Sequence, residues 1–406
     1  MHLACELLWF AVLSGNAADA LDWIRIALQA DGEADPAERS FVRSVVAVAD
    51  AQDHDAAGDE DAVLADVLAE LEAVDAVEWP PIVLFRAILS WLVGDRDTTV
   101  ALMREADEHP APWVRAAAPL ISAQLAENDG DLSTMRADHE TALARFREVG
   151  DRWGIAIVLG SQAGVWMIDG ELDAAAGALE EARALTGELG VPSQDVFLDM
   201  RLAELWTRRG DLARAREHLD RVGEERDLNR EEAVVVDALR ARLLWELGDQ
   251  AAARALRDRL VAAVAAGFGG RAERGHARAM ALTSIGQIAL GDGDVAAAAE
   301  ALDGAFAAAI ESRDMPIVAM TGVAAAQLAA RQGRPEDAAE MLGAAAVVRG
   351  APDEANLEIA GVTAELRDTL GEAAFSAAYA RGLEAERDAA LARLAPAASD
   401  AARVGP

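Results

Sequence analysis

The chain has 406 residues, with 37 basic and 71 acidic side chains and a formal net charge of −34. Such an acidic surface repels phosphate backbones and anionic lipids, so neither direct nucleic-acid binding nor a membrane role is expected. The sequence contains no lysine. This excludes Schiff-base chemistry and a Walker-type phosphate loop, because both need a lysine amine.

The first fifteen residues, MHLACELLWFAVLSG, are mostly apolar. They carry Glu6, have no basic residue, and are too short to span a bilayer. Cys5 is the single cysteine, so no internal disulfide is possible. These features predict a soluble, cytoplasmic protein that contains no membrane span.

A repeat then runs along most of the chain, marked by glycines that are usually followed by Asp, Asn or Glu. Their spacing of 36 to 45 residues suits two helices and two turns per unit. Glycine accepts the left-handed conformation that ends a helix, and the acidic or amide residue after it caps the next helix. The repeat glycines are Gly15, Gly58, Gly94, Gly130, Gly170, Gly210, Gly248, Gly293 and Gly333.

Small residues recur at two offsets after these glycines, near one stripe of the second helix. Small side chains there let paired helices approach closely, so we expect them in the core. Three units depart from the pattern with Val63, Thr99 and Met135 at the first offset. The two sets are Ala20, Ala175, Ala215, Ala253, Ala298 and Ala338, and then Ala27, Ala106, Ala142, Ala182, Ala305 and Ala345.

These patterns predict an all-α fold, an α-solenoid of about nine antiparallel helix hairpins in a right-handed, tetratricopeptide-like superhelix. We expect the repeat array over residues 1–350, C-terminal capping helices over 351–394 that hide its last apolar face, and a disordered tail over 395–406. The body is expected to be elongated and curved.

Three segments resemble the long-unit (MalT/LuxR-type) tetratricopeptide-like repeats of bacterial regulators. They are FREVGDRWGIAIVLGSQAGVWMIDGELDAAAGALEEARAL (146–185), GRPEDAAEMLGAAAVVRGAPDEA (333–355) and LGEAAFSAAYARGLEAERDAAL (370–391). In the first, Gly150, Asp151, Arg152, Trp153 and Gly154 resemble the turn between repeats. The family suggested is the SARP-like and large LuxR-type transcriptional regulators of actinobacteria, in which such a region follows a DNA-binding domain and an ATPase module.

This resemblance covers nearly the whole chain, but only the repeat region of that family. It implies a sensor or scaffold that controls transcription through protein contacts. No helix-turn-helix with a basic recognition helix and no phosphate loop is recognisable, so DNA binding and ATP hydrolysis are assigned to no residue. A DNA-binding and ATPase module would then act in cis or in trans, or the chain is a stand-alone adaptor.

In a hairpin solenoid the first helix of each unit lines the concave groove, and Arg, amide, Trp and Met side chains there suit capture of a protein or peptide partner. The alternative for each Trp and Met is ordinary packing between helices, and for each polar residue a solvated surface. The repeat register predicts a groove lined by Trp91, Gln124, Met167, Arg242, Trp245, Gln287, Met320 and Gln327.

No enzyme, cofactor or metal site is predicted. No two of the six histidines have the one-turn spacing of a helical metal site, and no nucleophile, base and orienting group can be assembled. We therefore predict a non-enzymatic interaction or sensor domain. The alternative is an effector-binding solenoid that takes a small molecule or peptide and signals by becoming more rigid.

Overall fold

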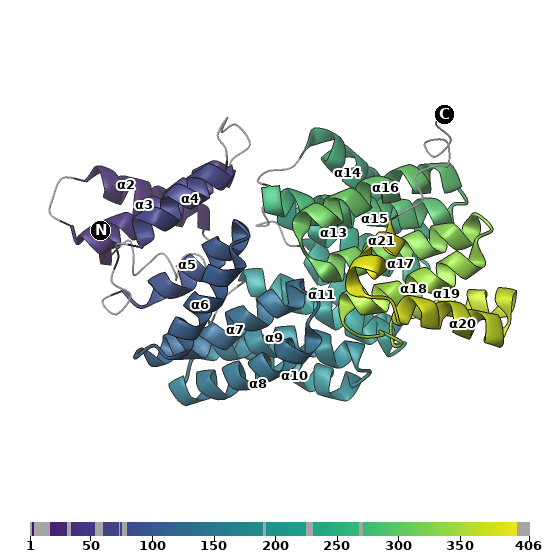
Figure 1. Cartoon of the computed structure of the whole chain (residues 1–406), viewed down its shortest axis with the longest axis horizontal. Coiled ribbons are helices and arrows are strands. Elements are labelled where there is room, and N and C mark those ends of the chain that lie inside the picture. The colour runs from purple at the N-terminus through teal and green to yellow at the C-terminus, as the bar shows by residue number, and fades with distance from the viewer. Residues whose placement is uncertain are drawn as a thin grey trace.

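The computed structural model describes residues 2–3, 17–30, 34–52, 60–72, 74, 79–189, 192–224, 230–267 and 271–395. Twenty α-helices form this part of the chain, as the sequence predicted, and successive helices pack as antiparallel neighbours (Figure 1). The repeat glycines Gly15 and Gly58, Cys5 and the tail from 396 onward lie outside the described residues. Three helices come first: α2 (Ala17–Gln29), α3 (Pro36–Gln52) and α4 (Glu60–Leu71).

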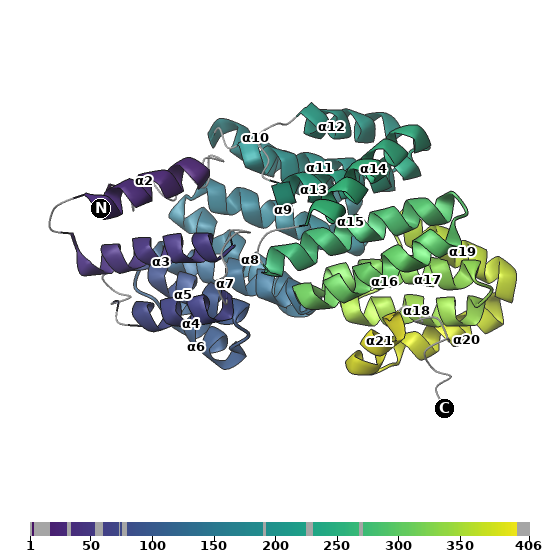
Figure 2. The ribbon, with the colours of Figure 1, turned by 90° about the horizontal axis from the view of Figure 1, so that it is seen from above.

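Seven hairpins with a glycine turn follow. Figure 2 shows their first helices placed side by side along the array. The hairpins are α5 (Pro81–Leu92) with α6 (Arg96–Asp107), α7 (Pro112–Asn128) with α8 (Leu132–Val149), α9 (Arg152–Ile168) with α10 (Leu172–Leu189), α11 (Pro192–Arg208) with α12 (Leu212–Glu224), α13 (Arg230–Glu246) with α14 (Gln250–Ala266), α15 (Arg271–Gly291) with α16 (Val295–Ser312), and α17 (Met315–Arg331) with α18 (Pro335–Arg349).

The left-handed glycine is confirmed in all seven hairpins, and the predicted cap after it is confirmed in five. Each turn glycine has a positive φ, between 68° and 83°. At Gly130 the next amide, of Asp131, donates back to the carbonyl of Ala126 at 2.8 Å, and the Asp131 carboxylate caps α8 through the amide of Thr134. Asp95, Asp211, Asp249 and Asp294 cap the second helix of their hairpins in the same way.

The small residues at the two repeat offsets are core residues, as predicted. Ala175, Ala215 and Ala253 are fully buried at the first offset, and at the second offset the alanines from 106 onward are buried as well. Ala27 alone remains half-buried. The departures at the first offset, Thr99 and Met135, are also buried, so these two hairpins accept a larger side chain at that core position.

The array does not stay open along its whole length. α7 contacts α17, five hairpins further on, and the carbonyl of Asp129 accepts a hydrogen bond from Arg387. The turn at Gly130 lies against the end of α18, because a Cβ at Gly130 would stand 2.3 Å from the carbonyl oxygen of Val348. The expectation of an elongated body is therefore corrected: the hairpins from α7 to α18 curl back on themselves.

Three helices close the chain: α19 (Leu357–Leu370), α20 (Glu372–Leu383) and α21 (Arg387–Leu394). α20 and α21 pack on α18, while α19 contacts α17, α18 and α20 more sparsely. In Figure 1 these yellow helices lie at the end of the molecule opposite the purple helices α2 to α4. Among the described helices, none is both long and apolar enough to cross a membrane.

Candidate binding site

In five of the seven hairpins the repeat places a polar residue six residues before the turn glycine, and from α11 onward this position lies on the inner wall of the array. This position is Glu204 in α11, Arg242 in α13, Gln287 in α15 and Gln327 in α17. Glu358, at the start of α19, is the common partner of the last three. Gln287 Nε2 donates to its carboxylate. Burial raises the pKa of Glu358, and Arg242, Gln287 and Gln327 oppose this rise. Helices separated by up to 85 residues of sequence therefore meet at one side chain.

Arg208, two residues before the turn glycine of α11, holds a second carboxylate of the same C-terminal segment. Its Nη1 and Nη2 donate to the two oxygens of Asp353 at 2.7 and 3.0 Å, and Nη2 also donates to Glu204 at 2.9 Å. The side chains of Arg208 and Asp353 are 6% and 0% exposed. A bidentate pair in this environment fixes residue 353 against the inner end of α11.

Arg242 stands at the centre of this group without a close ion pair. The carboxylates of Glu246, Glu204 and Glu358 act on it electrostatically and outweigh burial, which alone would lower its pKa, so its pKa is raised. Its Nε is buried and has no hydrogen-bond partner among the described residues. The guanidinium therefore keeps donor capacity for a further acceptor.

The pKa values of the neighbouring carboxylates Glu204 and Glu246 are shifted in opposite directions. Burial would raise the pKa of Glu204, but Arg208, Arg242 and Arg201 lower it to about 2. Burial among protein atoms raises the pKa of Glu246 to about 7, where Arg242 opposes the rise and Glu358 and Glu204 add to it. The carboxylate of Glu246 is surrounded by groups of the inner wall, although part of the side chain stays exposed to solvent.

The inner wall extends toward α9 and α7. At the equivalent position α9 has Gly164, and the guanidinium of Arg201 lies where a side chain would stand, 3.3 Å from an ideal Cβ. In α7 the equivalent Gln124 is exposed, and its Nε2 donates to Glu127 at 3.1 Å. Burial raises the pKa of Glu127, and Arg201 opposes this.

The predicted groove residues thus fall into groups according to how many residues they stand before the turn glycine. Arg242, Gln287 and Gln327 come together at Glu358. Met167 and Trp245 sit three residues before their glycines: Met167 is 1% exposed in the core, and Trp245 packs against Gly291 of the next hairpin.

Two other predicted residues lie elsewhere. Met320 packs against the core, and Trp91 is half-buried in α5. The prediction missed Glu204 and Arg208, although the repeat register points to both. Asp353 and Glu358 lie outside the repeat, so no register reveals them.

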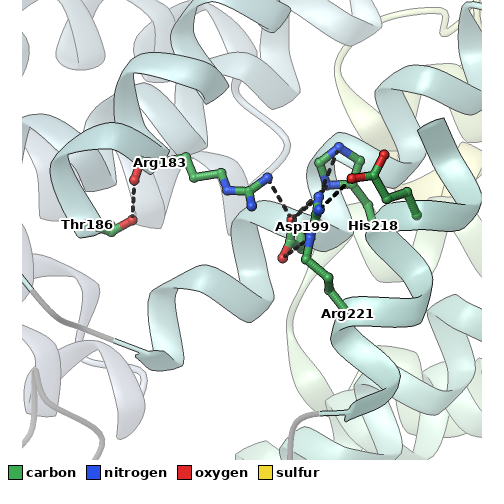
Figure 3. Close-up of polar contacts among 6 residues, drawn as sticks. Arg183, Thr186, Asp199, His218 and Arg221 are labelled. Carbon is green, nitrogen blue, oxygen red and sulfur yellow. Dashed lines mark hydrogen bonds and ion pairs between the residues drawn. The ribbon is translucent and has the colours of Figure 1, made fainter. Parts of the chain in front are cut away.

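A second polar cluster ties α10, α11 and α12 together (Figure 3). Asp199 lies 2.6 Å from His218 Nδ1, accepts from Arg221, and pairs with Arg183 at 3.3 Å. Burial would raise the pKa of Asp199, but these partners lower it. Asp199 and His218 are 6% and 8% exposed. This cluster contains a histidine and a carboxylate but no nucleophile, and its contacts join three helices.

A polar pocket of about 1140 Å³ opens between α6, α7 and α8. Arg145 and Asp107, which form an ion pair, stand on its wall, and Arg387 reaches it from α21. Within the described ranges, no three His, Cys, Asp or Glu side chains are grouped closely enough to hold a metal ion.

The fold and the inner wall define an all-helical protein of sequential antiparallel hairpins, consistent with a helical solenoid. No family model matches the chain, and no curated protein matches it significantly.

Proposed function

We propose that this chain is a non-enzymatic interaction and sensor domain of a bacterial transcriptional regulator, and that its inner face binds a protein or peptide partner. One observation carries the proposal. The inner ends of α11, α13, α15 and α17 present Arg and Gln side chains that bind residues 353–358 of the chain itself, a turn that leads into the first residues of α19. A surface that binds one short acidic segment has the chemistry to bind another.

The regulatory part of the proposal rests on the resemblance of three segments to the repeat regions of SARP-like and large LuxR-type regulators. A repeat array suits this role because each hairpin contacts mainly its neighbours, so a bound ligand can shift the curvature of the whole array. Sequencing the reading frame upstream of Met1 tests it. An encoded ATPase and DNA-binding module supports the regulator, and unrelated neighbouring genes favour the stand-alone adaptor.

The effector-binding alternative is favoured by one observation, the polar pocket between α6, α7 and α8. A small polar ligand there would bridge two hairpins and make the array more rigid. Thermal-shift screening separates the two proposals, because such a ligand raises the melting temperature with its concentration. Substituting Arg145 should abolish that shift, and substituting Arg242 should not.

Selection from a random peptide library tests the interaction role directly. Peptides selected on the wild-type protein should bind saturably, and Arg242→Ala should weaken them at least about tenfold, as loss of a charged hydrogen-bond donor does. Arg147→Ala is the matched control, because Arg147 is an exposed arginine on α8 paired only with Glu181. Equal binding to both variants, or no saturable binding, would contradict the proposal.

A further inference from the structure

We infer that the inner face is specific for an acidic peptide, and that residues 351–358 are a built-in competitor for that peptide. The inference rests on the proposed binding role of the inner face. It adds the chemistry of the partner and the reason that the face is occupied when no partner is present.

The contacts of the segment run along the inner face from one hairpin to the next. Ala351 packs with the core cluster of α7, α8 and α9. Asp353 then binds Arg208 of α11, and Glu358 binds Gln287 of α15 beside Arg242 of α13 and Gln327 of α17. A segment of eight residues therefore contacts helices from most of the array, in the way that a bound peptide would.

The charges of the wall select an acidic occupant. Without residues 351–358 the wall holds the guanidinium groups of four arginines against three carboxylates: Arg201, Arg208, Arg242 and Arg349 against Glu127, Glu204 and Glu246. This positive excess is local, in a chain whose net charge is −34. The segment supplies Asp353 and Glu358 to the wall, so its own charge complements the wall, while Glu354 is exposed.

The segment is attached in a way that permits exchange. Of the residues of α19, only Val362 and Leu366 are buried, whereas α20 and α21 are held directly by α18. Gly350 and Gly371, both with positive φ, bracket the segment and α19. An incoming carboxylate would replace Asp353 at Arg208, so the exchange leaves no buried charge unpaired.

A labelled peptide with the sequence of residues 350–360, GAPDEANLEIA, tests the inference in the full chain by fluorescence anisotropy. Glu358→Gln weakens the binding of the internal segment to the inner face, so the site is open for a larger fraction of the time. This variant should therefore bind the peptide about ten times more tightly than wild type. Glu354→Gln is the matched control, since Glu354 is an exposed acid of the same segment, and it should bind like wild type. A peptide with Asn in place of Asp353 and Gln in place of Glu358 should bind weakly to all three proteins.

Hydrogen exchange on the wild-type protein gives an independent readout if Glu358→Gln fails to fold. Excess acidic peptide should speed exchange in residues 350–366, and the amide peptide should not. Equal peptide affinity for wild type and Glu358→Gln, or unchanged exchange at saturation, overturns the inference. A dimer of Glu358→Gln that exchanges the segment between copies overturns it too.

The same measurements separate this inference from the proposed function. Neutral or basic peptides that are selected on the inner face and weakened by Arg242→Ala would uphold the binding role and refute the acidic specificity. If no peptide of any charge binds the inner face, the binding role itself fails.

Discussion

Arg208 and Asp353 are 145 residues apart in the sequence and form a buried ion pair with two hydrogen bonds. Arg208 belongs to the repeat, at the inner end of α11, whereas Asp353 follows the last hairpin. The pair thus joins the array to its C-terminal segment. The same Arg208 also donates to the carbonyl of Met167 at 3.2 Å, so one side chain links α9, α11 and the segment.

Removing either partner of this pair should destabilise the protein strongly. Arg208→Ala or Asp353→Asn leaves a buried charge without its partner, and the free energy of unfolding should fall by about 3–5 kcal/mol. Urea unfolding measures the change. Arg147→Ala, at an exposed pair, should alter stability by no more than about 1 kcal/mol.

The contact between the turn of α7 and α8 and the end of α18 predicts a difference between two equivalent glycines. Gly130 and Gly170 both have positive φ, so alanine at either should cost about 1–2 kcal/mol of backbone strain. A Cβ at Gly130 also collides with the carbonyl of Val348, while one at Gly170 meets nothing within 4 Å. Gly130→Ala should therefore lose about 1–3 kcal/mol more than Gly170→Ala. Equal losses would mean that the array does not curl back to α18.

The attachment of α20 to α18 depends on another glycine. A Cβ at Gly343 would stand 2.2 Å from the carbonyl oxygen of Tyr379, so Gly343→Ala should push α20 away and expose the end of the chain to limited proteolysis. Gly361→Ala in α19 is the control, because a Cβ at Gly361 has no atom within 4 Å and alanine favours a helix more than glycine does. That variant should be more stable by about 0.5–1 kcal/mol. Resistance of Gly343→Ala to proteolysis would place α20 elsewhere.

Because His139 is buried in its neutral form, the free energy of unfolding should fall in acid. Its side chain is 1% exposed, its Nδ1 has no hydrogen-bond partner within the described part of the chain, and burial lowers its pKa to about 4. Because this lies below the unfolded value of about 6.5, the unfolded chain takes up the proton first, and the contribution to stability is complete above pH 6.5 and falls toward pH 4.

The variant His139→Leu isolates this effect. Between pH 7 and pH 4.5, wild type should lose about 2–3 kcal/mol more than His139→Leu in urea unfolding. Parallel losses in the two proteins would show that His139 is not buried in its neutral form.

We expect the affinity for an acidic peptide to depend on pH through the protonation of Glu246. Its raised pKa of about 7 means that the carboxyl is neutral at pH 6 and charged at pH 8. Arg242, Glu358 and Glu204 surround it, so its protonation makes the wall more positive. An acidic peptide should bind more tightly at pH 6 than at pH 8, and Glu246→Gln should lose most of this dependence. A wild-type affinity that is flat over this range would contradict the assignment.

The sequence predicts the helical hairpins well because their signals are local. Glycine followed by aspartate encodes a helix end and the next cap within six residues, as Gly130 and Asp131 show. The polar groove positions Arg242, Gln287 and Gln327 follow from the repeat register. Met167 and Trp245 follow the alternative left open for them, packing between helices, because three residues of helix rotate a side chain toward the next hairpin.

The C-terminal half of the site could not be predicted. Asp353 and Glu358 belong to no repeat, and the side chains that donate to them, Arg208 and Gln287, are 145 and 71 residues away. Their positions depend on how the curvature accumulates over several hairpins, and each hairpin contributes only a small rotation. The sequence near residue 353 therefore does not indicate which part of the array this segment contacts.

A double-mutant cycle between Arg208 and Asp353 tests most directly whether residues 353–358 lie on the inner face. Arg208→Ala, Asp353→Ala and the double variant are unfolded in urea. A control cycle combines Arg208→Ala with Glu354→Ala. A coupling energy of at least about 1.5 kcal/mol for Asp353, and none for Glu354, is expected for a buried close pair. Coupling near zero for Asp353 would contradict the account.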